Sequence, residues 1–174
     1  DKVRPGGIIV FITSKGTLDK ENIQVRKYIA QRAELVGVIR LPDDTFKKNA
    51  GTEVTADIIV LQKRDSNIDV MPEWIYLGKD DNGIIINQYF IDNPEMILGS
   101  MQIVSGRFGP ESTCKADNEV PFEVQLENAT GLLHTQITER AVAEPEMADE
   151  EYIIADPNVR NFSFAVCNDR IYFR

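Results

Sequence analysis

The stretch that decides the fold reads PGGIIVFITS at residues 5–14. Its Pro-Gly-Gly is a turn signal, and the β-branched and aromatic run that follows has the length of a strand. A run without polar alternation is typical of a strand buried on both faces, as in a parallel sheet. We therefore predict that the chain opens with a buried strand of an α/β sheet.

A helix and two further strands are predicted next along the chain. Asp19 is placed to cap a helix that begins near Lys20, and the apolar positions at helical spacing are Val25, Tyr28, Ile29 and Ala33, with Arg26 on another face. The runs at residues 35–41 and 58–61 predict the second and third strands. Strand, helix and strand form a βαβ unit, which normally crosses over into a parallel sheet. The loop between the second and third strands has no periodicity, which is typical of a functional loop.

The rest of the chain is expected to hold smaller elements. Residues 74–77 and 84–86 flank the turn Asp-Asp-Asn-Gly and predict a hairpin. One helix face is predicted by Phe122, Leu126, Ala129, Leu133 and Ile137. Residues 144–151 are interpreted as an acidic linker, and residues 162–166 and 170–173 as a hairpin. The expected segments are the sheet at 1–64, a hairpin extension packed on it at 65–110, a helix and linker at 111–151, and a hairpin that starts a following region at 152–174.

The charges divide the chain into two parts. The whole chain of 174 residues has a formal net charge of −9. Residues 1–64 hold 12 Lys and Arg against 8 Asp and Glu, whereas residues 65–174 hold 7 against 20. Because like charges repel, the second part disfavours contact with nucleic acid and suits packing against protein. The first part is compatible with a nucleic-acid partner.

Several kinds of chemistry are excluded by missing motifs. No Gly-rich phosphate loop, dinucleotide-binding glycine pattern or His-Glu-x-x-His zinc motif is present. Cys114 and Cys167 are too few for a disulfide framework and fit no zinc motif, so we interpret both as reduced thiols of a cytosolic protein. No apolar run is long enough to span a membrane, and no leader opens the chain, which predicts a cytoplasmic protein without a membrane partner. We expect no catalytic residue and no metal site in this chain.

The strand series resembles the last third of an N6-adenine-specific DNA methyltransferase domain. The resemblance lies in the Pro-Gly-Gly strand, the VIRLP run at residues 38–42, Phe46 in the next loop, and the strand that ends near Lys63. These match the fifth strand, the sixth strand, the following loop and the seventh strand of that family. The chain looks especially like the large proteins of mobile elements that join such a methylase to a helicase. The resemblance implies the last three strands and one helix of a Rossmann-like sheet of the class I methyltransferases, with an appended hairpin and helical segment.

The resemblance also implies which residues contact DNA. Functional residues of doubly wound sheets gather at the carboxyl ends of the strands. Methylation of a base in a duplex requires that the base be flipped out, and an aromatic ring replaces the lost stacking. Phe46 matches the position of the family's stacking aromatic, and its alternative role is to plug the edge of the core. The expected contacts to DNA are Lys15, Lys47, Lys48, Asn49, Lys63 and Arg64, any of which can instead be an ordinary solvated side chain.

Two family motifs are absent from these residues. The glycine-rich loop for S-adenosylmethionine and the Asn-Pro-Pro-aromatic tetrapeptide lie upstream in the family, and Asn93-Pro94-Glu95-Met96 lacks the second proline and the aromatic. We therefore expect S-adenosylmethionine to bind the intact parent protein and not this chain, which is inactive alone. The chain begins at Asp1 and ends within an apolar run, so we expect a piece of a longer protein. Its expected partners are DNA, the amino-terminal half of the methylase, a helicase-like domain, and a second copy at an exposed sheet edge.

Two alternatives remain open from the sequence. One is a non-catalytic DNA-binding or protein-interaction module that keeps a methylase-like sheet. The other is a small α/β domain of unrelated function, which antiparallel first and second strands would favour. An upstream cofactor loop in the same reading frame would establish the methylase.

Overall fold

The computed structural model describes residues 2–106, 109–135, 160, 162–167 and 170–173. The chain divides into two compact units, Asp1–Thr138 and Glu139–Arg174. Each unit is described by itself. The acidic linker predicted at residues 144–151 and the helix position Ile137 lie outside the described residues.

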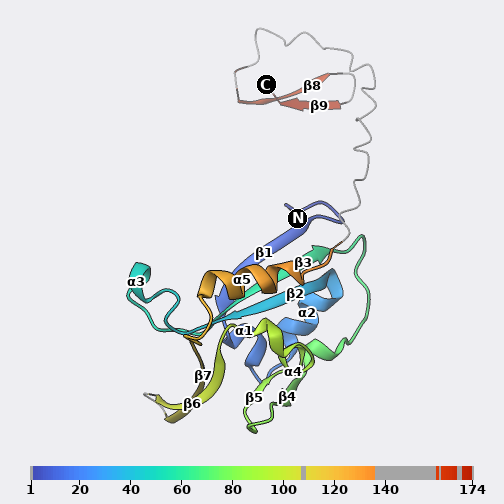
Figure 1. Ribbon diagram of the computed structural model, residues 1–174. Coiled ribbons are helices and arrows are strands. Elements are labelled where there is room, and N and C mark those ends of the chain that lie inside the picture. Colours follow the sequence, from blue (N-terminus) through green and yellow to red (C-terminus); the bar gives the residue numbers. More distant parts are fainter. Residues whose placement is uncertain (1, 107–108, 136–159, 161, 168–169, 174) are drawn as a thin grey trace. The chain divides into compact units, whose positions relative to one another are not determined.

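The first unit is built around a three-stranded sheet (Figure 1). Its strands are β1 (Ile8–Ser14), β2 (Ala33–Leu41) and β3 (Ala56–Lys63), in the order β1-β3-β2. β3 is antiparallel to both neighbours, so β1 and β2 run in the same direction without pairing. The mixed α/β class is confirmed, but the sheet is not wholly parallel as expected, because the antiparallel β3 lies between β1 and β2.

β1 forms an edge of this sheet and is not buried on both faces. Val10, Phe11 and Ile12 are 59%, 49% and 60% exposed. Consecutive side chains of a strand point to opposite faces, so apolar surface is uncovered on both sides of the edge. The prediction of a buried strand is therefore wrong for these residues, and the expected exposed apolar edge is present.

The helical region between β1 and β2 differs from the prediction in its start and its buried face. It consists of α1 (Gly16–Asp19) and α2 (Gln24–Arg32), so Asp19 ends the first helix and does not cap the second. The Asn22 side chain accepts a hydrogen bond from the backbone N–H of Gln24 at the start of α2. Val25 and Tyr28 are exposed, whereas Arg26 and Ala30 are buried. The Nε and Nη1 of Arg26 donate to the carbonyls of Ile75 and Lys20, both at 2.7 Å, whereas its buried Nη2 has no hydrogen-bond partner in the described part of the chain.

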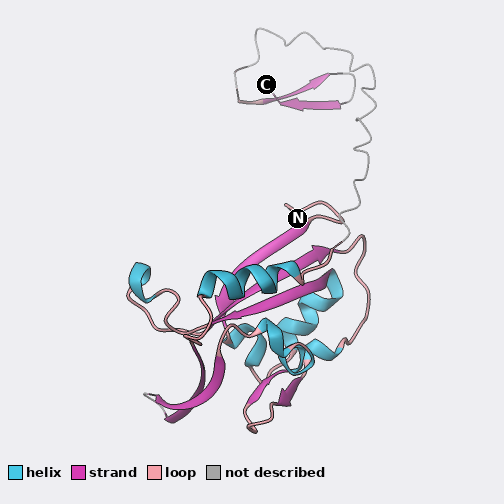
Figure 2. Cartoon of the chain, in the orientation of Figure 1, coloured by secondary structure: helices cyan, strands magenta, loops and turns pink. Residues whose placement is uncertain are grey.

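The remaining elements are short helices, hairpins and one longer helix (Figure 2). In chain order they are α3 (Lys47–Ala50), η1 (Glu73–Ile75), β4 (Leu77–Lys79), β5 (Ile85–Asn87), α4 (Gln88–Asp92), η2 (Pro94–Met96), β6 (Ser100–Gly106), β7 (Gly109–Lys115), α5 (Phe122–Gly131), β8 (Phe164–Cys167) and β9 (Arg170–Phe173). β4 pairs with β5, β6 with β7, and β8 with β9, each antiparallel. The hairpins predicted around residues 80–83 and 168–169 are confirmed, and the helix predicted from Phe122 ends at Gly131.

The core of the first unit lies where the sheet meets the helices. α5 lies across the sheet in Figure 1, and its Phe122 and Leu126 pack against the buried core, as does Leu133 just beyond its end. A Cβ on Gly37 of β2 would lie 2.3 Å from a Leu133 side-chain carbon, so a larger residue there would force the Leu133 side chain to move. Among the described residues, no helix is long and apolar enough to cross a membrane.

Candidate nucleic-acid interface

The ends of β1 and β2 meet at one end of the sheet, as the sequence predicts for a functional site. Ser14 of β1 and Leu41 of β2 both pair with Ala56, the first residue of β3. The backbone N–H of Lys15 donates to the carbonyl of Thr55 at 3.0 Å. Lys15 and the loop of residues 42–55 therefore belong to the same end, which we call the carboxyl end.

The loop of residues 42–55 carries most of the predicted contact residues. Phe46 stands immediately before α3, and Gly51 ends that helix with a φ of 64°, a value that favours glycine. The Phe46 side chain is half-buried and packs against the core, whereas Lys48 and Asn49 are exposed. Lys47 forms an ion pair with Glu53 at 2.5 Å, and this bond lowers the pKa of the Glu53 carboxyl. Lys47 and Lys48 are both exposed, and the charge of Lys47 is matched by a carboxylate.

Hydrogen bonds of polar side chains connect this loop to the antiparallel hairpin of β6 and β7, which we call the ribbon. Asp43 Oδ2 accepts hydrogen bonds from Thr113 Oγ1 at 2.8 Å and Lys115 Nζ at 2.6 Å. The Thr55 and Thr113 hydroxyl oxygens are 3.0 Å apart, and the backbone N–H of Cys114 donates to Thr55 Oγ1. These partners are 58–72 residues apart in sequence, so no short-range sequence pattern predicts that they form hydrogen bonds.

Lys15 also contacts this ribbon. Its Nζ donates to Ser112 Oγ on β7 at 3.1 Å. The bond orients the ammonium without cancelling its charge, because the hydroxyl is neutral. Lys15 therefore remains a cation at the carboxyl end, at the base of the ribbon.

A depression of about 380 Å³ lies beside the loop. Its lining comes from the loop and from the segment that leads into α5, and comprises Pro42, Asp44, Thr45, Lys48, Ala116, Asp117, Asn118, Val120, Pro121, Phe122 and Glu123. Phe122 contributes the aromatic side chain of this lining, and Phe46 does not belong to it. The sequence analysis assigned Phe122 only to a helix face and missed its place in the depression.

The charges of the depression favour a base over a phosphate. Asp44, Asp117 and Glu123 supply three carboxylates against the single ammonium of Lys48. Carboxylate oxygens accept hydrogen bonds from amino groups such as those of adenine and cytosine, and they repel phosphate. Phe122 is partly exposed and adds apolar surface against which a planar ring can pack, whereas Pro42 is buried.

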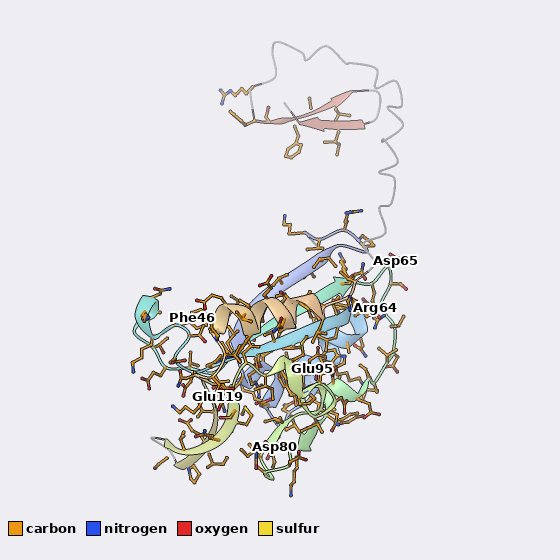
Figure 3. The ribbon with its side chains drawn as sticks, viewed as in Figure 1. Phe46, Arg64, Asp65, Asp80, Glu95 and Glu119 are labelled. Carbon is orange, nitrogen blue, oxygen red and sulfur yellow. The ribbon has the colours of Figure 1, made fainter. Side chains whose placement is uncertain are left out.

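Lys63 and Arg64 lie at the other end of the sheet, which we call the amino end. Lys63 pairs with Ala33 at the start of β2, and its neighbour Gln62 pairs with Ile8 at the start of β1. A strand of seven residues spans about 23 Å, so these two cations cannot share one site with Phe46. Figure 3 labels Phe46 and Arg64, which lie toward opposite ends of the sheet. The structure thus separates the predicted contact residues into two groups.

No catalytic or metal centre emerges from the described residues. In that part of the chain, no group of three or more His, Cys, Asp or Glu side chains is placed to hold a metal ion. Cys114 is fully buried, and burial raises the pKa of its thiol to about 12. This thiol is therefore unsuited to act as a nucleophile.

Comparison with known proteins gives one similarity of limited extent. No protein-family model matches the chain, and no solved structure matches it. Over 69 residues the chain is 30% identical to Defense against restriction protein B of Escherichia phage P1. The match covers 39% of this chain and 3% of the phage protein. The chain thus spans a small part of a much longer protein that acts, by its name, in defence against restriction.

Proposed function

We propose that the chain is the carboxyl-terminal part of an S-adenosylmethionine-dependent DNA adenine-N6 methyltransferase domain within a larger protein. It contributes contacts to the target base and the DNA backbone, and it is inactive alone. The finer fold in this proposal is the end of a Rossmann-like class I methyltransferase sheet. The intact protein continues into a helicase-like domain.

The uncovered edge of β1 is the observation that carries the proposal. A sheet with helical cover normally buries its apolar strands, yet three consecutive apolar residues of β1 are about half exposed or more. An amino-terminal half of the same sheet, placed against β1, would cover both faces of this edge. β1 and β2 also run in the same direction, as consecutive strands of a doubly wound sheet do.

The phage protein supports a restriction-related setting. Its name concerns defence against restriction, and methylation of adenine is one chemical means of protecting DNA from restriction. When bound in the intact protein, S-adenosylmethionine supplies the methyl group, which replaces one hydrogen of adenine N6 as that hydrogen leaves as a proton. The residues of this chain hold the flipped base and the backbone during that exchange.

The carboxyl end is the surface we assign to the target base. Its depression combines the partly exposed aromatic ring of Phe122 with carboxylates that can accept hydrogen bonds from an amino group. Phe46, Lys47, Lys48 and Asn49 lie on the adjoining loop, and Lys15 lies at the same end. We expect an aromatic ring of this end to stack on the flipped adenine.

The first experiment uses the intact protein encoded by the full reading frame. It should transfer labelled methyl groups from S-adenosylmethionine to adenine N6 in duplex DNA, and the 174-residue chain should transfer none. Absence of transfer by the intact protein would overturn the proposed activity. Calorimetry that detects micromolar S-adenosylmethionine binding to the chain alone would overturn the claim that the cofactor site lies elsewhere.

The second experiment assigns the stacking residue in the intact protein. Phe46→Leu and Phe122→Leu each keep an apolar side chain for packing and remove the aromatic face. Stacking is worth about 1–3 kcal/mol, so loss of the correct ring should weaken DNA affinity about 5- to 150-fold. Unchanged affinity and unchanged turnover in both variants would reject a stacking role at this end.

A further inference from the structure

Cations gather at the amino end of the sheet from three separate segments. Lys2 and Arg4 precede β1, Arg32 ends α2, and Lys63 and Arg64 end and follow β3. Backbone hydrogen bonds join these segments, since Gly6 N donates to Lys63 O and Arg64 N donates to Arg32 O. We call these five residues the amino-end cationic cluster.

Neutral carbonyl groups hold three of these cations in place. Lys63 Nζ donates to the carbonyl of Val3 at 2.5 Å, and Arg64 Nε donates to that of Ala30 at 3.2 Å. Arg32 Nη1 donates to the carbonyl of Tyr28 at 3.2 Å. A carbonyl orients a cation but carries no net charge, so the positive charge remains available to an anion.

Carboxylates neutralise this cluster only in part. Arg64 Nη1 lies 3.6 Å from Glu34 Oε2, which is a weak contact with an exposed side chain. Asp65 and Asp69 follow β3 at the same end. Among the described residues of this end, the five cations therefore stand beside the three carboxylates of Glu34, Asp65 and Asp69, whereas Lys47 and Lys115 at the carboxyl end each have a close carboxylate partner.

An exposed aromatic ring adjoins the cluster. The Arg32 guanidinium lies 3.6 Å from the centroid of the Tyr28 ring, and Tyr28 is 59% exposed. Surfaces that bind single-stranded nucleic acid combine cations for the backbone with aromatic rings for unpaired bases. Cations held by carbonyls and an accessible ring together match that combination.

We propose that the amino-end cationic cluster binds the phosphodiester backbone of nucleic acid, at a surface separate from the Phe46 loop. The inference rests on the proposed DNA-contacting function and does not depend on methyl transfer. The two ends are about 23 Å apart, so a duplex lying along the sheet places about seven base pairs between them. The cluster then holds the DNA at a distance from the target base.

The test measures binding of a fluorescent 20-base-pair duplex by the 174-residue chain as a function of salt. Lys2→Gln with Arg4→Gln removes two exposed cations of the cluster. Lys20→Gln with Lys79→Gln is the matched control, because it removes two exposed cations elsewhere. The cluster variant should bind about tenfold more weakly at low salt and lose about two from the slope of log affinity against log salt. The control should change affinity less than about twofold.

Four outcomes would overturn the inference. The first three are equal effects of the two double variants, an unchanged salt slope in the cluster variant, and absence of duplex binding by the chain. Displacement of the duplex by poly-L-glutamate as readily as by unlabelled DNA would show a general anion surface and would also overturn it. None of these outcomes bears on methyl transfer by the intact protein, which the labelled-methyl experiment tests.

Discussion

Arg40 of β2 and Asp57 of β3 are direct partners across the sheet, and their side chains form a two-pronged ion pair. Nε to Oδ1 is 2.8 Å and Nη2 to Oδ2 is 3.0 Å, with both side chains fully buried. Arg40 also pairs with Asp19 at 2.9 Å and lies over the Phe90 ring. Burial lowers the pKa of the Arg40 guanidinium, but the two carboxylates more than compensate and keep its pKa above the ordinary value. This charged group ties the end of α1 to both strands beneath the carboxyl end.

Arg40→Met should destabilise the chain strongly. The substitution keeps much of the side-chain volume but leaves Asp57 and Asp19 buried without their cation. Removal of one partner of a buried pair costs about 3–5 kcal/mol. Urea unfolding of the chain measures the change, with the exposed Arg4→Gln as the control, which should stay within about 0.5 kcal/mol. A loss below about 1 kcal/mol for Arg40→Met would contradict the central role of this pair.

Asp43 and Thr113 should act together in fastening the ribbon of β6 and β7. Their hydrogen bond is 2.8 Å long and buried, and the same Asp43 oxygen accepts from Lys115. In a double-mutant cycle of Asp43→Asn and Thr113→Val, we expect a coupling energy of about 0.5–3 kcal/mol. Thermal unfolding of the unsubstituted chain, the two single variants and the double variant gives the four free energies of unfolding. If the loss in the double variant equals the sum of the losses in the two single variants, other contacts hold the loop and the ribbon together.

Cys114 should be inert toward thiol reagents in the folded chain. The thiol is fully buried, and its pKa of about 12 leaves roughly a thousandfold less thiolate at pH 8 than an ordinary cysteine has. The measurement is the reaction with a chromogenic disulfide at pH 8, in a Cys167→Ser background with and without denaturant. Rapid reaction without denaturant would refute the buried, protonated state.

The same thiol should make stability depend on alkaline pH. Below the unfolded pKa of about 8.5, both states keep the proton and Cys114 has no effect on stability. Above that value the unfolded state loses the proton first, so stability should fall by about 1.4 kcal/mol per pH unit as the pH approaches the folded value. Denaturant unfolding at pH 8, 9 and 10 of the chain and of Cys114→Ala should show this slope in the chain and its loss in the variant.

The open edge of β1 should cause self-association of the chain studied alone. Val10 and Ile12 lie on one face of the strand and are both more than half exposed. Val10→Lys with Ile12→Lys should give a monomer, because charged side chains on an edge oppose strand pairing. Light scattering at several concentrations measures the mass, with Val124→Lys on α5 as the control, since Val124 is also an exposed apolar residue. A monomer at every concentration without any substitution would contradict this prediction.

Local sequence patterns predicted which helices and strands form better than they predicted which residues are buried in them. The apolar runs at residues 35–41 and 58–61 became β2 and β3, because runs of β-branched residues favour strands wherever they are placed. The helix face from Phe122 was also found, since spacing along one face determines which side can be buried. The burial of Arg26 was missed, because its partners are carbonyls of Ile75 and Lys20, which no helical spacing reveals.

The residues of the candidate site were also predicted only in part from local patterns. Lys15, Phe46, Lys47, Lys48 and Asn49 come to one end because they follow two strands that run in the same direction, which their order in the sequence suggested. Lys63 and Arg64 were grouped with them, although they end a strand that runs the opposite way. The direction of β3 is set by pairing with both neighbours and not by its own residues.

The sequence that opens with Pro5, Gly6 and Gly7 by itself determined that a strand follows, and it established the order of strands, helix and loop in the first 64 residues. Turn signals and apolar periodicity act over a few residues, so they can be read without knowledge of the rest of the chain. Only the tertiary structure decided that β3 lies between β1 and β2, that β1 is left at an edge, and that the cations divide between two ends about 23 Å apart. These features depend on hydrogen bonds and ion pairs between residues far apart in the chain, whose partners exist only once the sheet has formed.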